Sequence, residues 1–595
     1  MIRDHFRVLV MDLAAGKGKV AKIDGRDEVA GGSGLAALLF NLYGLPDRPW
    51  DDPAQPFILA IGPLTGYFPL MSKTVAAFKS PYHDQYAESH AGGRSALALR
   101  FADYDALVLV GRAARPSVLV VGSRRVELRD AQFLWGMDAL NVAKRLRQMS
   151  GGSGHRSILR IGPAGENRSA LACINVDTYR HFGRLGSGAV LGAKNVKAVA
   201  IRGDADFPFD QGGATCGGAV SKDYPKLFKE IHRQLTDTQM MSKYHNLGTA
   251  GNVAALNELK SLPWRNLQQT TDPGVEGISG ERFADETLLR NTACAGCPVG
   301  CVHIGFVREK FMADNRWLYR QVSYDYELIF AVGSMLGVTS AFDVLRIVDA
   351  VEKQGLDVMG AGVALAWATE ALEKGLLTPG QVLEPLAFGD ANAYARAVEH
   401  LGRAANEFYR DLGRGALVAA DTYGGADFAC VLGQEMAGYA TGELYFVAQA
   451  LGFRHSHLDS AAYSWDQKHD EKDVDKGVEF LVADESGRSF LTSMVSCLFA
   501  RGVYKDELLA QALESVGYTA LARNMAQVGE HIRRLRWRTR FATGFNPEAV
   551  RIPKRFTEVS TWKGPVDPVY MEALRRAYAK RLRELGKPLE DEAPA

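Results

Sequence analysis

The segment Cys294-Ala295-Gly296-Cys297-Pro298-Val299-Gly300-Cys301 places three thiols within eight residues, and Pro298 and Gly300 favour a tight loop. Thiolates at this spacing are typical ligands of an iron–sulfur cluster, whose fourth ligand can come from a distant part of the chain. Cys497 is the natural candidate for that ligand. Two alternatives stay open: a structural zinc site, for which His303 could serve as a ligand, and thiols that bind no metal.

The cysteine loop follows a change of pattern near residue 207. Short runs typical of strands occur before it, at residues 8–13, 106–110, 118–121 and 197–201. Apolar residues at helical spacing occur after it, over 341–353, 363–374 and 391–410. Glycines near residue 415 indicate a further boundary. We therefore predict a multi-domain α+β protein with a β-rich domain at 1–206 and two mainly helical domains at 207–415 and 416–595.

Composition limits the class of protein. The 595 residues include 70 Lys and Arg against 69 Asp and Glu, and no run of five or six like charges occurs, so we expect no nucleic-acid partner. No uncharged apolar stretch approaches the ~18 residues of a membrane-spanning helix, and no export signal is visible, so we expect no membrane insertion. Seven cysteines are too few for a disulfide scaffold. These features predict a cytoplasmic enzyme with a small-molecule substrate.

Segments on both sides of the cysteine loop resemble, in order, those of the tungsten-dependent aldehyde:ferredoxin oxidoreductase family. They are Ile61-Gly62-Pro63-Leu64-Thr65-Gly66, Lys79-Ser80-Pro81, Ser89-His90-Ala91-Gly92-Gly93, Asp103-Tyr104-Asp105-Ala106, residues 161–167 and 183–195, Asp325-Tyr326-Glu327, Gly355-Leu356-Asp357, Glu435-Met436-Ala437-Gly438-Tyr439, His457-Leu458 and Cys497. The resemblance covers nearly the whole chain.

The resemblance implies a set of cofactors. It places one tungsten, held by the dithiolenes of two pterins, between a pterin-binding β-rich base and the helical domains. It adds one 4Fe-4S cluster on Cys294, Cys297, Cys301 and Cys497, and a magnesium ion that bridges the pterin phosphates. Glycine turns and cationic side chains suit such phosphates. The residues expected to contact the pterins are Lys73, His90, Gly92, Gly93, Arg184, Leu185, Gly186, Asp357, Gly360 and Thr492.

Three residues match active-site positions of the family. Glu327 precedes an apolar run, where burial would raise the pKa of its carboxyl towards the range of a general acid or base. A surface acid at a helix start is the alternative. His457 would hydrogen-bond a metal oxo group or the carbonyl oxygen of the substrate and stabilise developing charge, and Tyr439 is a second donor.

Departures from the family bear on cofactor binding. Asp357-Val358-Met359-Gly360-Ala361-Gly362 keeps much of the pterin motif Asp-x-x-Gly-Leu-Cys, but its second copy, Thr492-Ser493-Met494-Val495-Ser496-Cys497, lacks the acid and the glycine. The anchoring of one pterin is therefore in question. His90 stands where the family has asparagine, and Lys73 where it has arginine. Residues 349–352 lack the histidine with which some members bind iron between two subunits, so we expect no such iron.

The segment Arg454-His455-Ser456-His457-Leu458-Asp459 is dense in charge and imidazole. One hypothesis is that it lines the substrate pocket and favours anionic substrates, since an arginine binds a carboxylate through two hydrogen bonds. His455 and Asp459 would then orient the site from behind. The alternative is a structural ion pair between Arg454 and Asp459.

Together these features predict an enzyme that oxidises an aldehyde to a carboxylic acid and passes electrons singly through the cluster to ferredoxin or a ferredoxin-like subunit. A homodimer or hetero-oligomer is expected. One alternative is a relative that works in the reducing direction, such as the catalytic subunit of an aryl-CoA reductase. Another is a non-catalytic iron–sulfur scaffold or electron-transfer subunit, which the altered motif at Thr492 would allow.

Overall fold

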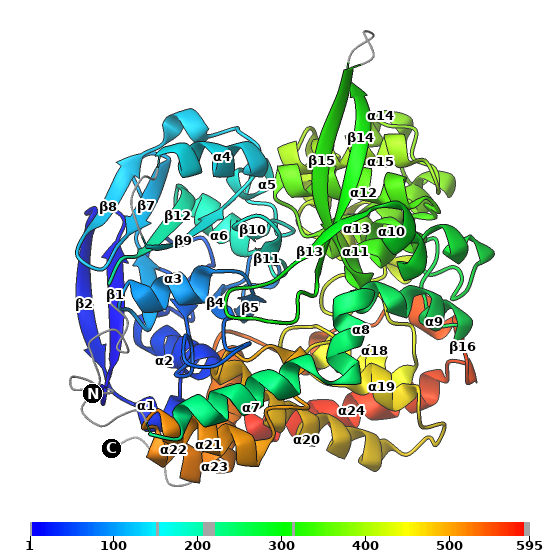
Figure 1. Cartoon of the computed structure of the whole chain (residues 1–595). Coiled ribbons are helices and arrows are strands. Elements are labelled where there is room, and N and C mark those ends of the chain that lie inside the picture. Colours follow the sequence, from blue (N-terminus) through cyan, green and yellow to red (C-terminus); the bar gives the residue numbers. More distant parts are fainter. Residues whose placement is uncertain (1–2, 150–153, 206–220, 312–315, 588–595) are drawn as a thin grey trace.

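The N-terminal part of the chain contains two six-stranded sheets (Figure 1). The structure, a computed structural model, describes residues 3–149, 154–205, 221–311 and 316–587. The first sheet has the order β2-β1-β6-β3-β4-β5, and its strands are β1 (Phe6–Asp12), β2 (Lys17–Ile23), β3 (Phe57–Ala60), β4 (Thr74–Lys79), β5 (Tyr86–Ala91) and β6 (Ala106–Val110). The second has the order β11-β10-β9-β12-β7-β8, and its strands are β7 (Ser117–Val121), β8 (Val126–Asp130), β9 (His155–Arg160), β10 (Ile174–Val176), β11 (Arg180–Phe182) and β12 (Val196–Gly203).

Alternation along β1 explains how the sheets pack. Leu9 and Met11 point into the core between the two sheets, whereas Val8 and Val10 point to the opposite face. Helix α2 (Gly32–Tyr43) covers that opposite face. Because successive side chains of a strand point to opposite faces, a strand with both faces buried reads as a continuous apolar run.

The C-terminal part is mainly helical, as predicted. Helices α12 (Ala341–Gln354), α13 (Val358–Glu373), α15 (Ala391–Arg403) and α16 (Glu407–Leu412) occupy the segments with helical spacing. Further long helices are α7 (Tyr224–Thr236), α20 (Val474–Ser493), α23 (Met525–Ala542) and α24 (Pro568–Leu585). Both α13 and α18 (Glu443–Leu451) contribute to one hydrophobic core, so the division near residue 415 stays a prediction.

A three-stranded antiparallel sheet lies inside the segment that the sequence predicts to be mainly helical. Its strands are β13 (Leu288–Thr292), β14 (Val302–Phe311) and β15 (Arg316–Tyr324), and the β14–β15 pair stands out from the body in Figure 1. The buried residues Val307, Val322 and Tyr324 share the face that packs on the main hydrophobic core, with the alternation of a strand. The cysteine loop connects β13 to β14.

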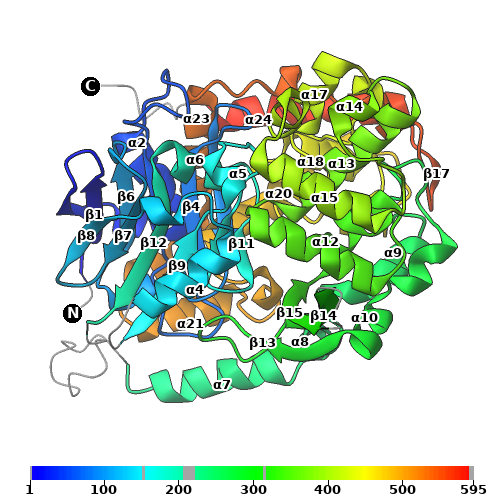
Figure 2. The ribbon, with the colours of Figure 1, turned by 90° about the horizontal axis from the view of Figure 1, so that it is seen from above.

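The two six-stranded sheets form a β-rich base, and the C-terminal helices form a helical cover over it. The base and the cover meet at glycines. Figure 2 shows the sheets on one side and helices α12, α13 and α15 on the other. A Cβ atom on Gly162 would lie 2.3 Å from the carbonyl oxygen of Gln354, at the end of α12, and one on Gly62 would lie 2.4 Å from that of Met494. A Cβ on Gly32 would lie 2.5 Å from the carbonyl oxygen of Thr492. Only glycine permits so close an approach of two backbones.

Within the described residues, no single helix is long and apolar enough to cross a membrane. One pair of helices, Tyr326–Leu336 and Ala341–Gln354, meets the length and composition criteria together, but it is bent by 107°. The apolar side chains of this pair belong to the main hydrophobic core.

Candidate active site

The four predicted cluster ligands lie in one region, although Cys497 is distant in sequence. The backbone N–H of Cys497 donates to the carbonyl of Leu70 (2.9 Å), and Leu70 N–H donates to Gly296 in the cysteine loop (3.1 Å). Cys297 and Cys301 interact electrostatically with Cys294 and with Cys497. Segments nearly two hundred residues apart are therefore held together by backbone hydrogen bonds through Leu70.

The buried thiols of the cysteine loop have raised pKa values. Within the described part of the chain, no group of three His, Cys, Asp or Glu side chains is arranged to hold one metal ion. The cluster, and the zinc alternative, therefore stay predictions from the cysteine spacing. Burial raises the pKa of Cys297 to about 12 and that of Cys301 to about 11, so a bound metal would have to displace their protons.

Gly92 and Gly93 bring the β-rich base against the cysteine loop. They follow β5, and the carbonyl of Gly93 accepts a hydrogen bond from Ala295 N–H (3.0 Å). A Cβ atom on Gly92 would lie 2.7 Å from Cys294 Sγ. The glycine pair therefore lies beside the expected cluster, where a larger residue would displace the thiol.

Arg180, which the sequence analysis missed, lies between the cysteines and the acidic motif. Burial would lower the pKa of its guanidinium, but Cys294, Cys301 and Asp325 outweigh burial and raise it. No motif marks Arg180 in the sequence, because its role depends on the chain path from β11 to the cysteine loop. One cation thus links the region of the thiols to the start of α11 (Tyr326–Val332).

The predicted catalytic residues Glu327, Tyr439 and His457 meet around one carboxylate. The hydroxyl of Tyr439 donates to Glu327 Oε1 (3.1 Å), and His457 Nε2 lies 3.2 Å from the same oxygen. Glu327 is in the first turn of α11, while Tyr439 precedes α18 and His457 follows it. Three segments therefore converge on one buried acid, which is not at a surface helix start.

The expected direction of the Glu327 pKa is wrong. Burial does raise this pKa, but the hydrogen bonds from His457 and Tyr439 outweigh burial and lower it. Burial and the charge of Glu327 instead raise the pKa of Asp325, whose carboxylate caps α11 by accepting from Leu328 N–H (3.2 Å). Glu327 is therefore ionised at neutral pH, as a general base must be.

Arg184 and Asp357, both predicted to contact a pterin, face one another across the base and the cover. Arg184 Nε lies 3.5 Å from Asp357 Oδ2, and Arg184 also donates to the carbonyl of Glu435. Asp357 caps α13 by accepting from Gly360 N–H (2.9 Å), which explains the Asp-x-x-Gly motif as a helix N-cap. Leu185 accepts from Ser80 Oγ (2.8 Å), so its loop is fixed to the turn after β4. Gly186 packs against Pro81 in that same turn.

His90 and Lys73 belong to the β-rich base and lie near the candidate active site. His90 contacts Glu88 (3.2 Å) and Arg454 (3.3 Å), and burial together with the charge of Arg454 lowers its pKa to about 4. The charge of Lys73 acts on both His90 and Cys301, so this cation lies between the expected pterin and cluster positions.

The second copy of the pterin motif has lost its capping role. The hydroxyl of Thr492 donates back to the carbonyl of Ser489 (3.0 Å) inside α20, whereas Asp357 caps the helix that follows it. The backbone of Thr492 nevertheless packs directly against Gly32. The segment with the altered motif therefore packs against the β-rich base although it lacks the acid. The effect of the missing acid on cofactor binding stays a prediction.

Buried polar atoms without partners indicate that the site accommodates an additional group. Arg184 Nη1, Arg180 Nε and His457 Nδ1 are buried and have no hydrogen-bond partner among the described residues. Buried polar atoms are almost always hydrogen-bonded, so each of these three atoms has room for a partner from a bound ligand. The oxygens, nitrogens and sulfurs of a pterin cofactor would supply the missing partners, and the residues present therefore fit that group.

Arg454 and Asp459 form the ion pair of the second hypothesis. Arg454 Nε lies 2.7 Å from Asp459 Oδ1, and both side chains are buried. His455 is structural as well, because its Nδ1 donates to the carbonyl of Ala450 (2.8 Å) and its Nε2 accepts from Arg540 (2.6 Å). Of this segment, His457 contacts the carboxylate of Glu327.

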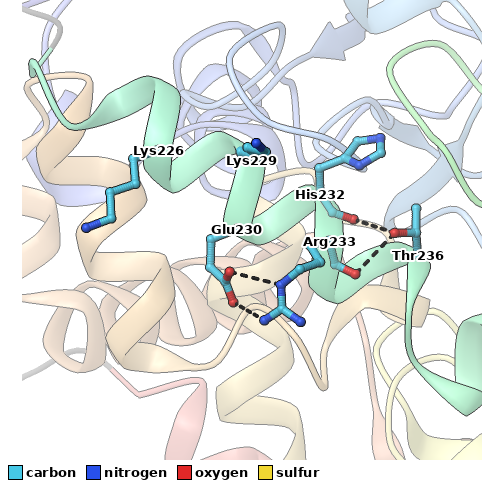
Figure 3. Close-up of a pocket in the computed structure, with 6 residues that line it drawn as sticks. All are labelled: Lys226, Lys229, Glu230, His232, Arg233 and Thr236. Atoms are coloured by element: carbon cyan, nitrogen blue, oxygen red, sulfur yellow. Dashed lines mark hydrogen bonds and ion pairs between the residues drawn. The ribbon is translucent and has the colours of Figure 1, made fainter.

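A hollow on the outer face of α7 is separate from this site. Figure 3 shows its lining side chains, which are Lys226, Lys229, Glu230, His232, Arg233 and Thr236. Glu230 and Arg233 pair across one turn (2.7 Å). One helix supplies the whole lining, and none of the predicted site residues is in it.

Comparisons with known proteins identify the family of this chain. Residues 8–203 match the family model for the N-terminal domain of aldehyde ferredoxin oxidoreductase, and residues 226–592 match the model for its domains 2 and 3. These matches place the chain in the class of oxidoreductases. More narrowly, the chain belongs to the aldehyde ferredoxin oxidoreductase family, whose members use tungsten and a pterin, and the resemblance seen in the sequence is confirmed.

Two related proteins and one solved structure are similar to this chain over most of its length. The tungsten-containing aldehyde ferredoxin oxidoreductase of Pyrococcus furiosus is 27% identical over 580 residues, which are 94% of this chain and 92% of that protein. The WOR-like subunit of an aliphatic sulfonate oxidoreductase from the same organism is 29% identical over 476 residues, 76% of this chain and 72% of that one. The active site complex of benzoyl coenzyme A reductase with 1,5-dienoyl-CoA superposes with a TM-score of 0.78 at 20% identity, covering 97% and 95% of the two chains. This last likeness shows the fold alone.

The Arg454–Asp459 pair gives a first prediction. Replacing Arg454 with Met should lower the free energy of unfolding by about 3–5 kcal/mol, because Asp459 would stay buried without its cation. Turnover of simple and of anionic substrates should fall equally. Denaturant unfolding measures the first effect and steady-state kinetics the second.

Arg551→Met is the matched control, since Arg551 pairs with Asp421 at the same 2.7 Å but on the surface. Its loss should cost less than about 1 kcal/mol. Unchanged stability of Arg454→Met, with a KM raised only for anionic substrates, would restore the pocket hypothesis.

Proposed function

We propose that this chain oxidises an aldehyde to a carboxylic acid on a tungsten–bis-pterin cofactor and passes the electrons through a 4Fe-4S cluster to ferredoxin or a ferredoxin-like subunit. The observation that carries the proposal is the contact of Glu327 with both Tyr439 and His457, whose buried Nδ1 has no hydrogen-bond partner among the described residues. A cytoplasmic location, and assembly as a homodimer or with a partner subunit, belong to the same proposal.

Glu327 acts as the general base. The reaction converts an aldehyde and one water into a carboxylic acid, two protons and two electrons. Glu327 takes the proton of the attacking water, because hydrogen bonds from His457 and Tyr439 keep its carboxylate ionised. The cofactor, when bound, would supply the two-electron acceptor. A cluster on the four cysteines would pass the electrons on singly.

His457 and the cations of the base position the reacting groups. His457 orients Glu327 through Nε2, and its buried Nδ1 has no partner among the described residues and is the atom left to contact a ligand. Arg184 and Lys73 would bind anionic oxygens of the pterins, and magnesium between the phosphates would add to that charge. Cys294, Cys297, Cys301 and Cys497 would hold the cluster.

A second candidate function is reduction of an aryl-CoA ester. The solved structure that superposes along nearly the whole chain is described as a complex of benzoyl coenzyme A reductase, and this favours the candidate. A buried acid–base group and cluster-binding thiols would suit this reaction as well, because reduction of an aromatic ring also requires the transfer of protons and of single electrons. The substrate pair therefore has to be tested directly.

The test uses protein purified without oxygen. We expect tungsten, pterin and about four irons per chain, and oxidation of aldehydes with a viologen acceptor. Glu327→Gln and His457→Ala should keep both metals while turnover falls at least ~100-fold, the usual effect of a lost base or donor. Iron without tungsten would support the scaffold alternative, and aryl-CoA reduction without aldehyde oxidation would support the second candidate.

The cluster ligands give a separate prediction. Replacing Cys294, Cys297, Cys301 or Cys497 with Ala should lower bound iron and abolish electron transfer to the acceptor. Iron analysis and electron paramagnetic resonance measure this loss.

Cys173→Ala and Cys430→Ala are matched controls, because these buried thiols donate to the carbonyls of Leu356 and Asn266, each at 3.4 Å. Cys216, which lies outside the described residues, should also tolerate Ala. Full iron content in Cys497→Ala would assign the fourth ligand to another residue.

Tyr439 sets the pH dependence of the base. Tyr439→Phe removes a hydrogen bond that stabilises the ionised form of Glu327, so the pKa of Glu327 should rise. The acid limb of the pH profile of kcat/KM should then move to higher pH by about one to two units, the effect of one hydrogen bond to a charged group.

Tyr445→Phe is the control, because this buried hydroxyl donates to Gln449 (2.8 Å) and not to Glu327. The acid limb of the pH profile of kcat/KM should not move in Tyr445→Phe. An equal shift in both variants would show that the change reflects packing and not the hydrogen bond.

A further inference from the structure

Aromatic rings surround the catalytic carboxylate. The ring of Tyr439, whose hydroxyl donates to Glu327, has its centroid 4.9 Å from Tyr326, 4.8 Å from Tyr463 and 5.2 Å from His457. Buried rings at such distances are often core packing. A ring that contacts a substrate must instead keep part of its surface uncovered by other side chains.

Tyr463 differs from its neighbours in its hydrogen bonding. Tyr326 donates to the carbonyl of Gly438, and Tyr445 donates to Gln449 (2.8 Å). Both are almost fully buried. Tyr463, on α19 (Ala462–Asp466), is only partly buried, and its hydroxyl makes no hydrogen bond within the described part of the chain. It is therefore the accessible member of the group.

The geometry of Tyr463 suits a flat ligand. Its ring stacks on Tyr439 with an interplanar angle of 27° and meets the edge of Tyr445 at 80°. Tyr463 is stacked on the ring whose hydroxyl donates to Glu327, and the buried Nδ1 of His457, on the same group of rings, has no hydrogen-bond partner among the described residues. Aromatic rings attract one another in stacked and edge-to-face arrangements beyond the effect of apolar area.

We propose that Tyr463 is a specificity-determining residue that, together with Tyr439, makes the site prefer substrates with an aromatic ring attached to the reacting carbonyl. The inference rests on the proposed function for the identity of the reacting group. An aryl group would lie against the accessible ring of Tyr463 while its carbonyl carbon faces Glu327. A saturated ring of the same size would fill the same space without the ring–ring attraction.

The test compares benzaldehyde with cyclohexanecarbaldehyde, which have the same ring size and the same reacting group. Wild-type protein should have a higher kcat/KM for benzaldehyde by about 2- to 12-fold, the effect of one aromatic contact. Tyr463→Leu should reduce that ratio towards one, and Tyr463→Phe, which keeps the ring, should retain it. Tyr319→Leu, at an exposed tyrosine on β15, is the control and should also retain it.

A binding measurement separates this inference from the proposed function. Calorimetric titration with benzoate and with cyclohexanecarboxylate needs no turnover, and benzoate should bind more tightly to wild type and to Tyr463→Phe but not to Tyr463→Leu. If no aldehyde is oxidised, the proposed function fails while the binding ratio still decides the role of Tyr463. An equal ratio in wild type and Tyr463→Leu, in kinetics or in binding, overturns the inference.

Discussion

The site depends on one constraint, which is that the backbone of the β-rich base lies directly against the backbone of the helical cover. At Gly162 and Gly62 the opposing carbonyl oxygens would lie within 2.5 Å of any added Cβ, so no side chain separates the two parts. The residues expected to hold the cofactor belong to both parts, such as Arg184 on one and Asp357 on the other, 3.5 Å apart. Their spacing is accurate because the backbones that carry them are in contact, and interiors so closely packed deform little.

Burial of charge is the second constraint, and it decides the chemistry. A carboxylate taken out of water is protonated unless hydrogen bonds or cations favour its ionised form. Two acids two residues apart have opposite outcomes. Glu327 receives hydrogen bonds from Tyr439 and His457, and its pKa falls, whereas Asp325 has mainly burial and a like charge beside it, and its pKa rises. The environment, rather than the type of residue, favours the ionised form of Glu327 that the proposed general base requires.

The sequence predicted the fold class and most of the candidate site, because both depend on local patterns and on a resemblance along the whole chain. The Asp-x-x-Gly pattern is such a local feature, since Asp357 caps the helix three residues later. The sequence analysis missed the β14–β15 sheet because helical spacing dominates this part of the chain. The alternation of buried and exposed residues in the two strands is short by comparison. The direction of the Glu327 pKa was missed because it depends on donors more than a hundred residues away, and sequence distance carries no sign of them.

Arg180 shows how tertiary structure joins parts that the sequence keeps separate. Its guanidinium faces Cys294 and Cys301 on one side and Asp325 on the other, and its charge lowers the pKa of both Cys301 and Asp325. A buried cation is costly unless anionic partners surround it, so the residue can be retained only where thiolates and a carboxylate meet. The predicted cluster ligands and the acidic motif at the start of α11 are therefore adjacent, because one buried charge interacts with both.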